Sequence, residues 1–126
     1  MILALKIICG LFAALMAMFG LRWWFDFSGI EAEWQVDTLT NLGMNNLTAD
    51  MGALFPGTTI LIVLGLRAGK SAWLLSAAVL MLVAAAGRLL AFATTGYEAG
   101  ALTALVVEVV SAIILWFTHT RMSSAA

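Results

Sequence analysis

Two charged side chains interrupt otherwise apolar stretches in the second half of the chain, Arg88 and Glu108. A charge near the centre of a membrane helix costs about 2.5–3.5 kcal/mol on insertion scales, so it is seldom kept without a partner or a function. Asp50 is a second acid, close to the start of another apolar stretch. These three residues are the candidates for an intramembrane ion pair or a polar ligand site.

Small residues accompany both charges at helical spacing. Ala84 lies one turn before Arg88, and Ala112 lies one turn after Glu108. Because small residues let helices approach closely, both faces are expected to point toward other helices and not toward lipid. At a helical rise of about 1.5 Å per residue, Glu108 lies roughly 15 Å and Arg88 roughly 8 Å from the outer ends of their helices. The sequence therefore predicts an Arg88–Glu108 bridge with Asp50 as a second acid, while pairing of Arg88 with Asp50 stays open.

Two interpretations of these charges remain open. A buried ion pair can fix the register of two helices even where desolvation offsets its Coulomb energy. Alternatively, the charges line a polar cavity that binds an anionic or hydrogen-bonding ligand, or passes a proton. One arginine facing two acids would leave an odd negative charge in such a cavity.

Other candidate chemistry is sparse. His119 is the only histidine, and one histidine among scattered carboxylates is no metal-ligand pattern. Cys9 is the only cysteine, which excludes an intrachain disulfide or a pair of redox cysteines. No nucleophile–base constellation or glycine-rich phosphate loop is present. We therefore expect no catalytic residues, no metal and no cofactor, and a protein that is not an enzyme.

The composition is that of a membrane protein. The 126 residues are 63% hydrophobic and 10% charged, whereas soluble domains carry about 45–50% apolar and about 25% charged residues. Such a chain cannot cover a surface that faces water. Its net charge of −1 argues against nucleic acid as a partner. The length predicts a single domain, with membrane lipids as its first partners.

Four apolar stretches predict four transmembrane helices in an antiparallel up-down bundle. Their expected bounds are about 2–24, 46–66, 71–93 and 99–118. The first is interpreted as a retained helix because no small-x-small cleavage site follows it. Pro56, the only proline, falls inside the second helix and is expected to kink it.

The segment 28–43 is the longest polar stretch and predicts a short amphipathic helix on the membrane surface. Ser28 and Glu31 have the spacing of a capping box. The residues expected to share its apolar side are Ile30, Trp34, Leu39 and Leu42. A solvated acidic loop is the alternative.

The cations predict the orientation. One side of the membrane would carry Lys6, Arg67, Lys70 and Arg121, and the other would carry Arg22 among acidic residues. The positive-inside rule then places both termini in the cytoplasm.

The chain resembles a family of small bacterial four-helix membrane proteins that is classed as a domain of unknown function and is distantly similar to the DoxX-like proteins. The resemblance covers most of 45–121 and rests on Asn45, Leu47, Ala49, Gly52, Gly87, Arg88 and Glu108. The family has a Glu, an Arg and a Tyr at the positions of Asn46, Thr48 and Met51. These departures fall on the second-helix half of any shared site. Asn46, at the position of the family's Glu, is the candidate residue there, beside Arg88, Glu108 and Asp50. The resemblance implies a four-helix fold in a bacterial inner (plasma) membrane and no particular activity.

The leading functional expectation is a non-enzymatic integral membrane protein. It would be an accessory subunit, or a binder of a lipid-like or small anionic ligand at the cluster of intramembrane charges. The alternative is a proton-coupled transporter that uses Glu108 and works as an oligomer, because four helices are few to enclose a translocation path. A subunit of a redox or photosynthetic assembly is a third possibility.

Overall fold

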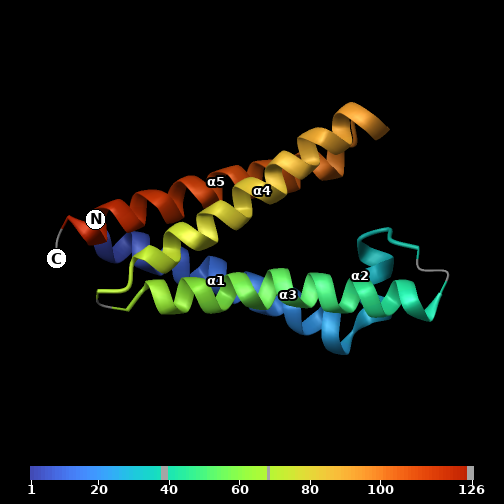
Figure 1. Ribbon diagram of the computed structural model, residues 1–126, viewed down its shortest axis with the longest axis horizontal. Coiled ribbons are helices and arrows are strands. Elements are labelled where there is room, and N and C mark those ends of the chain that lie inside the picture. Colours follow the sequence, from blue (N-terminus) through green and yellow to red (C-terminus); the bar gives the residue numbers. More distant parts are fainter. Residues whose placement is uncertain (38–39, 68, 125–126) are drawn as a thin grey trace. The chain divides into compact units, whose positions relative to one another are not determined.

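The structure is a computed structural model that describes residues 1–37, 40–67 and 69–124. Its helices are α1 (Ile2–Phe25), α2 (Phe27–Glu33), α3 (Asn41–Gly65), α4 (Ala72–Thr95) and α5 (Ala99–Ser123) (Figure 1). All except α2 are long and apolar enough to cross a membrane. At most 28% of the most apolar window of each is buried within the protein, so most of these side chains need apolar surroundings. The predicted all-α membrane fold, with a short helix between the first two spans, is confirmed.

The short helix α2 ends at Glu33, well before the predicted end near Gly43. Gln35 has a φ of +54°, and its N–H donates to the carbonyl of Ala32 at 3.3 Å. The N–H of Val36 donates to the carbonyl of Glu31 at 3.0 Å. This pair of bonds is a Schellman motif, which satisfies the last carbonyls and turns the chain away from the helix axis.

Helix α3 begins at Asn41, earlier than the predicted start at 46, because Thr40 caps it. The Thr40 hydroxyl accepts a hydrogen bond from the N–H of Gly43 at 3.0 Å, the usual bond of a threonine N-cap. Asn46 therefore lies inside the helix, beyond its first turn. Leu42 also lies in α3 and is 70% exposed, so it does not share the apolar side of α2; Leu39 lies outside the described residues.

The other boundaries lie closer to the predicted ones, except that α5 continues from the predicted end at 118 to Ser123. The guanidinium of Arg121 lies 4.7 Å from the ring centroid of Phe117, one turn earlier. Ser123 Oγ lies 3.0 Å from Ser71 Oγ at the start of α4. These contacts hold the last turn in helical form.

The start of α2 also differs from the prediction. Asp26, and not Ser28, precedes α2 as its N-cap residue.

The chain divides into two compact units, 1–10 with 61–126, and 11–60. In the first unit, α4 and α5 run antiparallel and side by side along their lengths (Figure 1). Buried small residues lie on both helices, among them Ala77, Ala78, Ala85, Ser111 and Ala112. Small side chains bring the two backbones close, which is how helices pack without a hydrophobic driving force in lipid.

In the second unit, α1 and α3 run antiparallel with little space between their backbones. A Cβ added at Gly20 would lie 2.5 Å from Pro56 Cγ, and one added at Gly52 would overlap Trp24 Nε1. The ring of Pro56 is thus seated against a glycine. Pro56 lies inside α3 as expected, and the kink at this residue stays a prediction.

An aromatic cluster joins α2 to α1 and α3 within the second unit. Trp34 packs edge-on against Phe19, Trp23 and Phe55, with centroid distances of 5.5, 5.7 and 5.5 Å. Ile30 is completely buried in the same cluster. Edge-to-face contacts between aromatic rings add to the packing energy of their buried area. Ile30 and Trp34 therefore hold the short α2 in place. They are two of the four residues that were predicted to form its apolar side.

Candidate functional site

The α4–α5 hairpin brings Arg88 and Glu108 together. Arg88 Nε donates a hydrogen bond to Glu108 Oε1 over 2.8 Å, a distance typical of a charge-assisted bond. The Glu108 side chain is 13% exposed and the Arg88 side chain is 33% exposed. The acid therefore lies deeper in the hairpin than the base, which reaches toward it from the next helix.

The second carboxylate oxygen of Glu108 has no partner. Oε2 is buried and accepts no hydrogen bond from the described residues. Arginine can grip a carboxylate with two parallel bonds, but here only Nε donates. Leaving a buried acceptor unsatisfied costs about 1–3 kcal/mol, and more for a charged group. This oxygen can therefore accept a hydrogen bond from a donor outside the described residues.

The surroundings of the pair are small and mostly apolar. Ala112, one of the two alanines predicted to face inward, is buried about one turn from Glu108, whereas Ala84 is half-buried. Ala85 is buried about one turn before Arg88. Ser111 is also buried, but its hydroxyl donates to the backbone carbonyl of Glu108 at 3.0 Å and not to the carboxylate. At Gly87, an added Cβ would meet no atom within 4 Å. The surface of α4 is therefore open at Gly87, the residue before Arg88.

Asp50 and Asn46, the other predicted members of the cluster, belong to the second compact unit. Both lie in α3 and both are exposed. Within that unit, the described residues provide Asp50 with no ion pair. A shared site with Arg88 and Glu108 stays a prediction.

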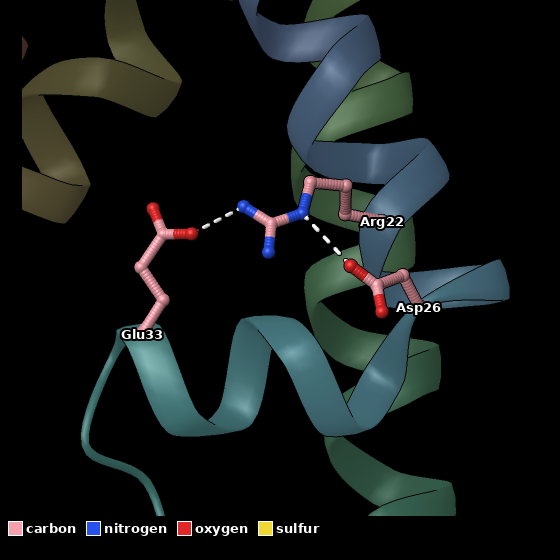
Figure 2. A network of polar contacts seen from close by, with 3 residues as sticks. All are labelled: Arg22, Asp26 and Glu33. Atoms are coloured by element: carbon pink, nitrogen blue, oxygen red, sulfur yellow. Dashed lines mark hydrogen bonds and ion pairs between the residues drawn. The ribbon is translucent and has the colours of Figure 1, made fainter.

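A second network of charges lies in the second unit and was not among the predicted sites. Arg22 Nε donates to Asp26 Oδ2 at 3.2 Å, and Arg22 Nη1 donates to Glu33 Oε2 (Figure 2). The i, i+4 spacing of Arg22 and Asp26 is typical of an ion pair within a helix, so this contact could have been predicted from the sequence. The contact to Glu33 depends on the path of the chain through α2, which spacing alone does not reveal. The network contains one cation and two acids, so it keeps a net negative charge.

A smaller polar group lies at the other end of the hairpin, in the first unit. His119 Nδ1 lies 3.2 Å from Ser71 Oγ, and Ser123 Oγ lies 3.4 Å from the same nitrogen. Cys9 Sγ lies 3.4 Å from Thr118 Oγ1. These contacts link the start of α1, the start of α4 and the end of α5. Among the described residues, no carboxylate takes part in these contacts that could activate a serine or histidine.

The fold and the charged pair define a small multi-pass helical membrane protein. No protein-family model, curated protein or solved structure matches the chain. The arrangement of its own side chains therefore has to carry any inference about its function.

Proposed function

We propose that this chain is a non-enzymatic integral membrane protein that binds a lipid-like or small anionic ligand at Arg88 and Glu108. The observation that carries the proposal is the buried Glu108 Oε2, which has no hydrogen-bond partner among the described residues. Intramembrane charges that persist despite their cost commonly mark binding sites or ion pathways.

The chemistry of the pair describes the ligand. Arg88 uses only Nε toward Glu108, so its two terminal nitrogens are left to donate to an anionic or carbonyl group. Glu108 Oε2 would accept a bond from a hydroxyl or amide of the same molecule. In the low dielectric of a membrane these bonds are stronger than in water. A ligand with an acidic group beside a hydrogen-bond donor satisfies both partners.

The same oxygen, Glu108 Oε2, also suits an accessory subunit. A partner helix that presents a hydrogen-bond donor at this depth would satisfy Glu108 in place of a small ligand. This version is favoured if the chain is extracted from its membrane only as part of a heteromeric complex.

The proposal also includes the orientation of the chain and the membrane in which it lies. The cations Lys6, Arg67, Lys70 and Arg121 favour both termini in the cytoplasm by the positive-inside rule. The resemblance to the bacterial four-helix family favours the inner membrane of a bacterium.

Native mass spectrometry of the protein, gently extracted from its own membrane, tests the proposal. We expect a defined extra mass on the wild-type chain that is lost in Arg88→Gln and in Glu108→Gln. Arg67→Gln is the matched control, because Arg67 is an exposed arginine of the same unit outside the pair. A bare chain in the wild type, or an extra mass that survives both substitutions, would contradict ligand binding at this pair.

A proton-coupled transporter is the second candidate, and the same oxygen favours it. A carboxylate with one bonded and one free buried oxygen can take up a proton on the free oxygen without breaking its bond to arginine. The chain would have to act as an oligomer to enclose a path. In vesicles with an imposed pH gradient, Glu108→Gln should abolish proton uptake coupled to substrate. Uptake that persists in this variant would exclude Glu108 as the carrier.

A further inference from the structure

An open groove runs along one face of α1 in the second unit. It is shallow and open to its surroundings, and its apolar lining comes from this one helix: Ala14, Ala17, Met18, Leu21 and Phe25. These residues recur at the spacing of a single helix face. Arg22 and Asp26 line the same groove at one end. The groove is thus apolar along its length and charged where it finishes.

The length of the groove corresponds to one leaflet of a bilayer. From Ala14 to Asp26 the helix rises about 18 Å at 1.5 Å per residue. The hydrocarbon core is about 30 Å thick, so one leaflet contributes about 15 Å. Trp24 is adjacent to the charged end and half exposed, and exposed tryptophans favour the level of the headgroups. The apolar part therefore lies at the depth of an acyl chain, and the charged end lies at the depth of a headgroup.

The charged end has a specific donor and acceptor pattern. Arg22 uses Nε and one terminal nitrogen toward Asp26 and Glu33 (Figure 2). Its second terminal nitrogen takes no part in these bonds and can donate to a phosphate. Each acid bonds through one oxygen, and the other oxygen can accept. The three side chains are 28%, 53% and 53% exposed, so a headgroup can reach them.

We infer that this groove binds a phospholipid with a primary ammonium headgroup, of the phosphatidylethanolamine type. The acyl chain lies against Ala14 and Ala17, the phosphate accepts from Arg22, and the ammonium donates to the free oxygens of Asp26 and Glu33. A choline headgroup has no N–H to donate to these oxygens. A glycerol headgroup adds a negative charge to a network that is already negative and brings no cation to the acids. The groove and its charges therefore select the primary amine.

Lipid titration of the full-length protein followed by native mass spectrometry tests this inference. The probes are ethanolamine, choline and glycerol phospholipids with identical acyl chains. We expect one ethanolamine lipid per chain, bound about tenfold more tightly than the choline lipid, which is the size of one charge-assisted hydrogen bond. Asp26→Asn should reduce this preference, whereas Asp37→Asn, at an exposed acid outside the network, should leave it unchanged.

Filling the groove provides an independent test. Ala14→Leu with Ala17→Leu should abolish binding of the lipid, while Ala53→Leu, at an exposed alanine of α3, should not. If the filled variant does not fold, the effect of Asp26→Asn on the preference for the ethanolamine lipid still tests the choice of headgroup. Equal binding of the three lipids by the wild type would overturn the inference. So would a dimer that dissociates when the groove is filled, because the occupant would then be a second copy of the chain.

Discussion

Arg88 Nε lies 2.8 Å from Glu108 Oε1 across the α4–α5 hairpin, while the other oxygen of the same carboxylate is buried without a partner among the described residues. The two oxygens of one side chain are therefore inequivalent. One accepts a hydrogen bond from an arginine on the neighbouring helix, and the other has room in its hydrogen-bonding capacity for a donor from another molecule. A register-fixing ion pair would gain from engaging both oxygens. The one-sided geometry accordingly favours a site that is completed by another molecule.

Breaking the pair should destabilise the hairpin more than removing it altogether. We expect Arg88→Met to lower the free energy of unfolding by about 3 kcal/mol, at the low end for a broken buried pair because Arg88 is one-third exposed. The double variant Arg88→Met, Glu108→Leu should recover most of this loss, since no uncompensated charge remains. Denaturant titrations in micelles measure both. A double variant as unstable as the sum of its single changes would show that the pair does not act as a unit.

Close packing between α3 and α4 at Gly65 should be sensitive to a single methyl group. A Cβ added there would lie 2.6 Å from Leu74 Cγ and 2.7 Å from the backbone nitrogen of Leu74. Gly65→Ala should therefore cost about 1–3 kcal/mol. Gly57→Ala in the same helix is the control: its Cβ would meet nothing within 4 Å, and helix propensity favours alanine by up to about 1 kcal/mol. Equal stability of the two variants, measured by thermal unfolding, would refute the close approach.

The N-cap of α3 should be measurable by substitution of Thr40. Thr40→Ala removes the hydrogen bond to the N–H of Gly43 and should cost about 0.5–2 kcal/mol. Thr40→Ser keeps a capping hydroxyl and should have little effect. Amide exchange of 41–44 should accelerate in the alanine variant alone. If the exchange rates of these amides are unchanged in the alanine variant, Thr40 is not the N-cap of α3.

Gln35 should tolerate glycine better than alanine. Its φ of +54° is unfavourable for any residue with a Cβ. Gln35→Gly should therefore stabilise α2 by up to about 1 kcal/mol, whereas Gln35→Ala keeps the strain and should not. Protection of the α2 amides from exchange distinguishes the two variants. Stabilisation by alanine as well would mean that the glutamine side chain, and not its backbone, is the source of strain.

The orientation can be read from single cysteines. In a Cys9→Ser background, we expect Ser28→Cys to react with a membrane-impermeant maleimide in intact spheroplasts, because it lies beside the acidic segment. Ser124→Cys, next to Arg121, should react only after the membrane is opened. Both serines are exposed, so differences in labelling report the side of the membrane. The reverse pattern would invert the proposed topology.

Much of the helical architecture was predictable from the sequence because it depends on local composition. Long apolar stretches must be helical in lipid, where each backbone polar group needs an internal partner. The small residues around Arg88 and Glu108 likewise indicated a face turned toward a neighbouring helix. Helix ends were predicted less well. The Schellman motif at Gln35 uses a residue that is uncommon in its conformation, and the cap at Thr40 lies six residues before the predicted start of the helix.

The tertiary structure determined which side chains contact each other, which composition does not predict. The sequence determined that the chain is apolar enough to cross a membrane four times and that Arg88 and Glu108 are its two costly charges. Only the folded hairpin decided that Arg88 reaches one oxygen of Glu108, and that no residue in the described ranges reaches the other. Only the turn through α2 brought Glu33 to Arg22. Hydropathy is a property of each segment alone, whereas a contact between two side chains depends on the register and path of separate elements.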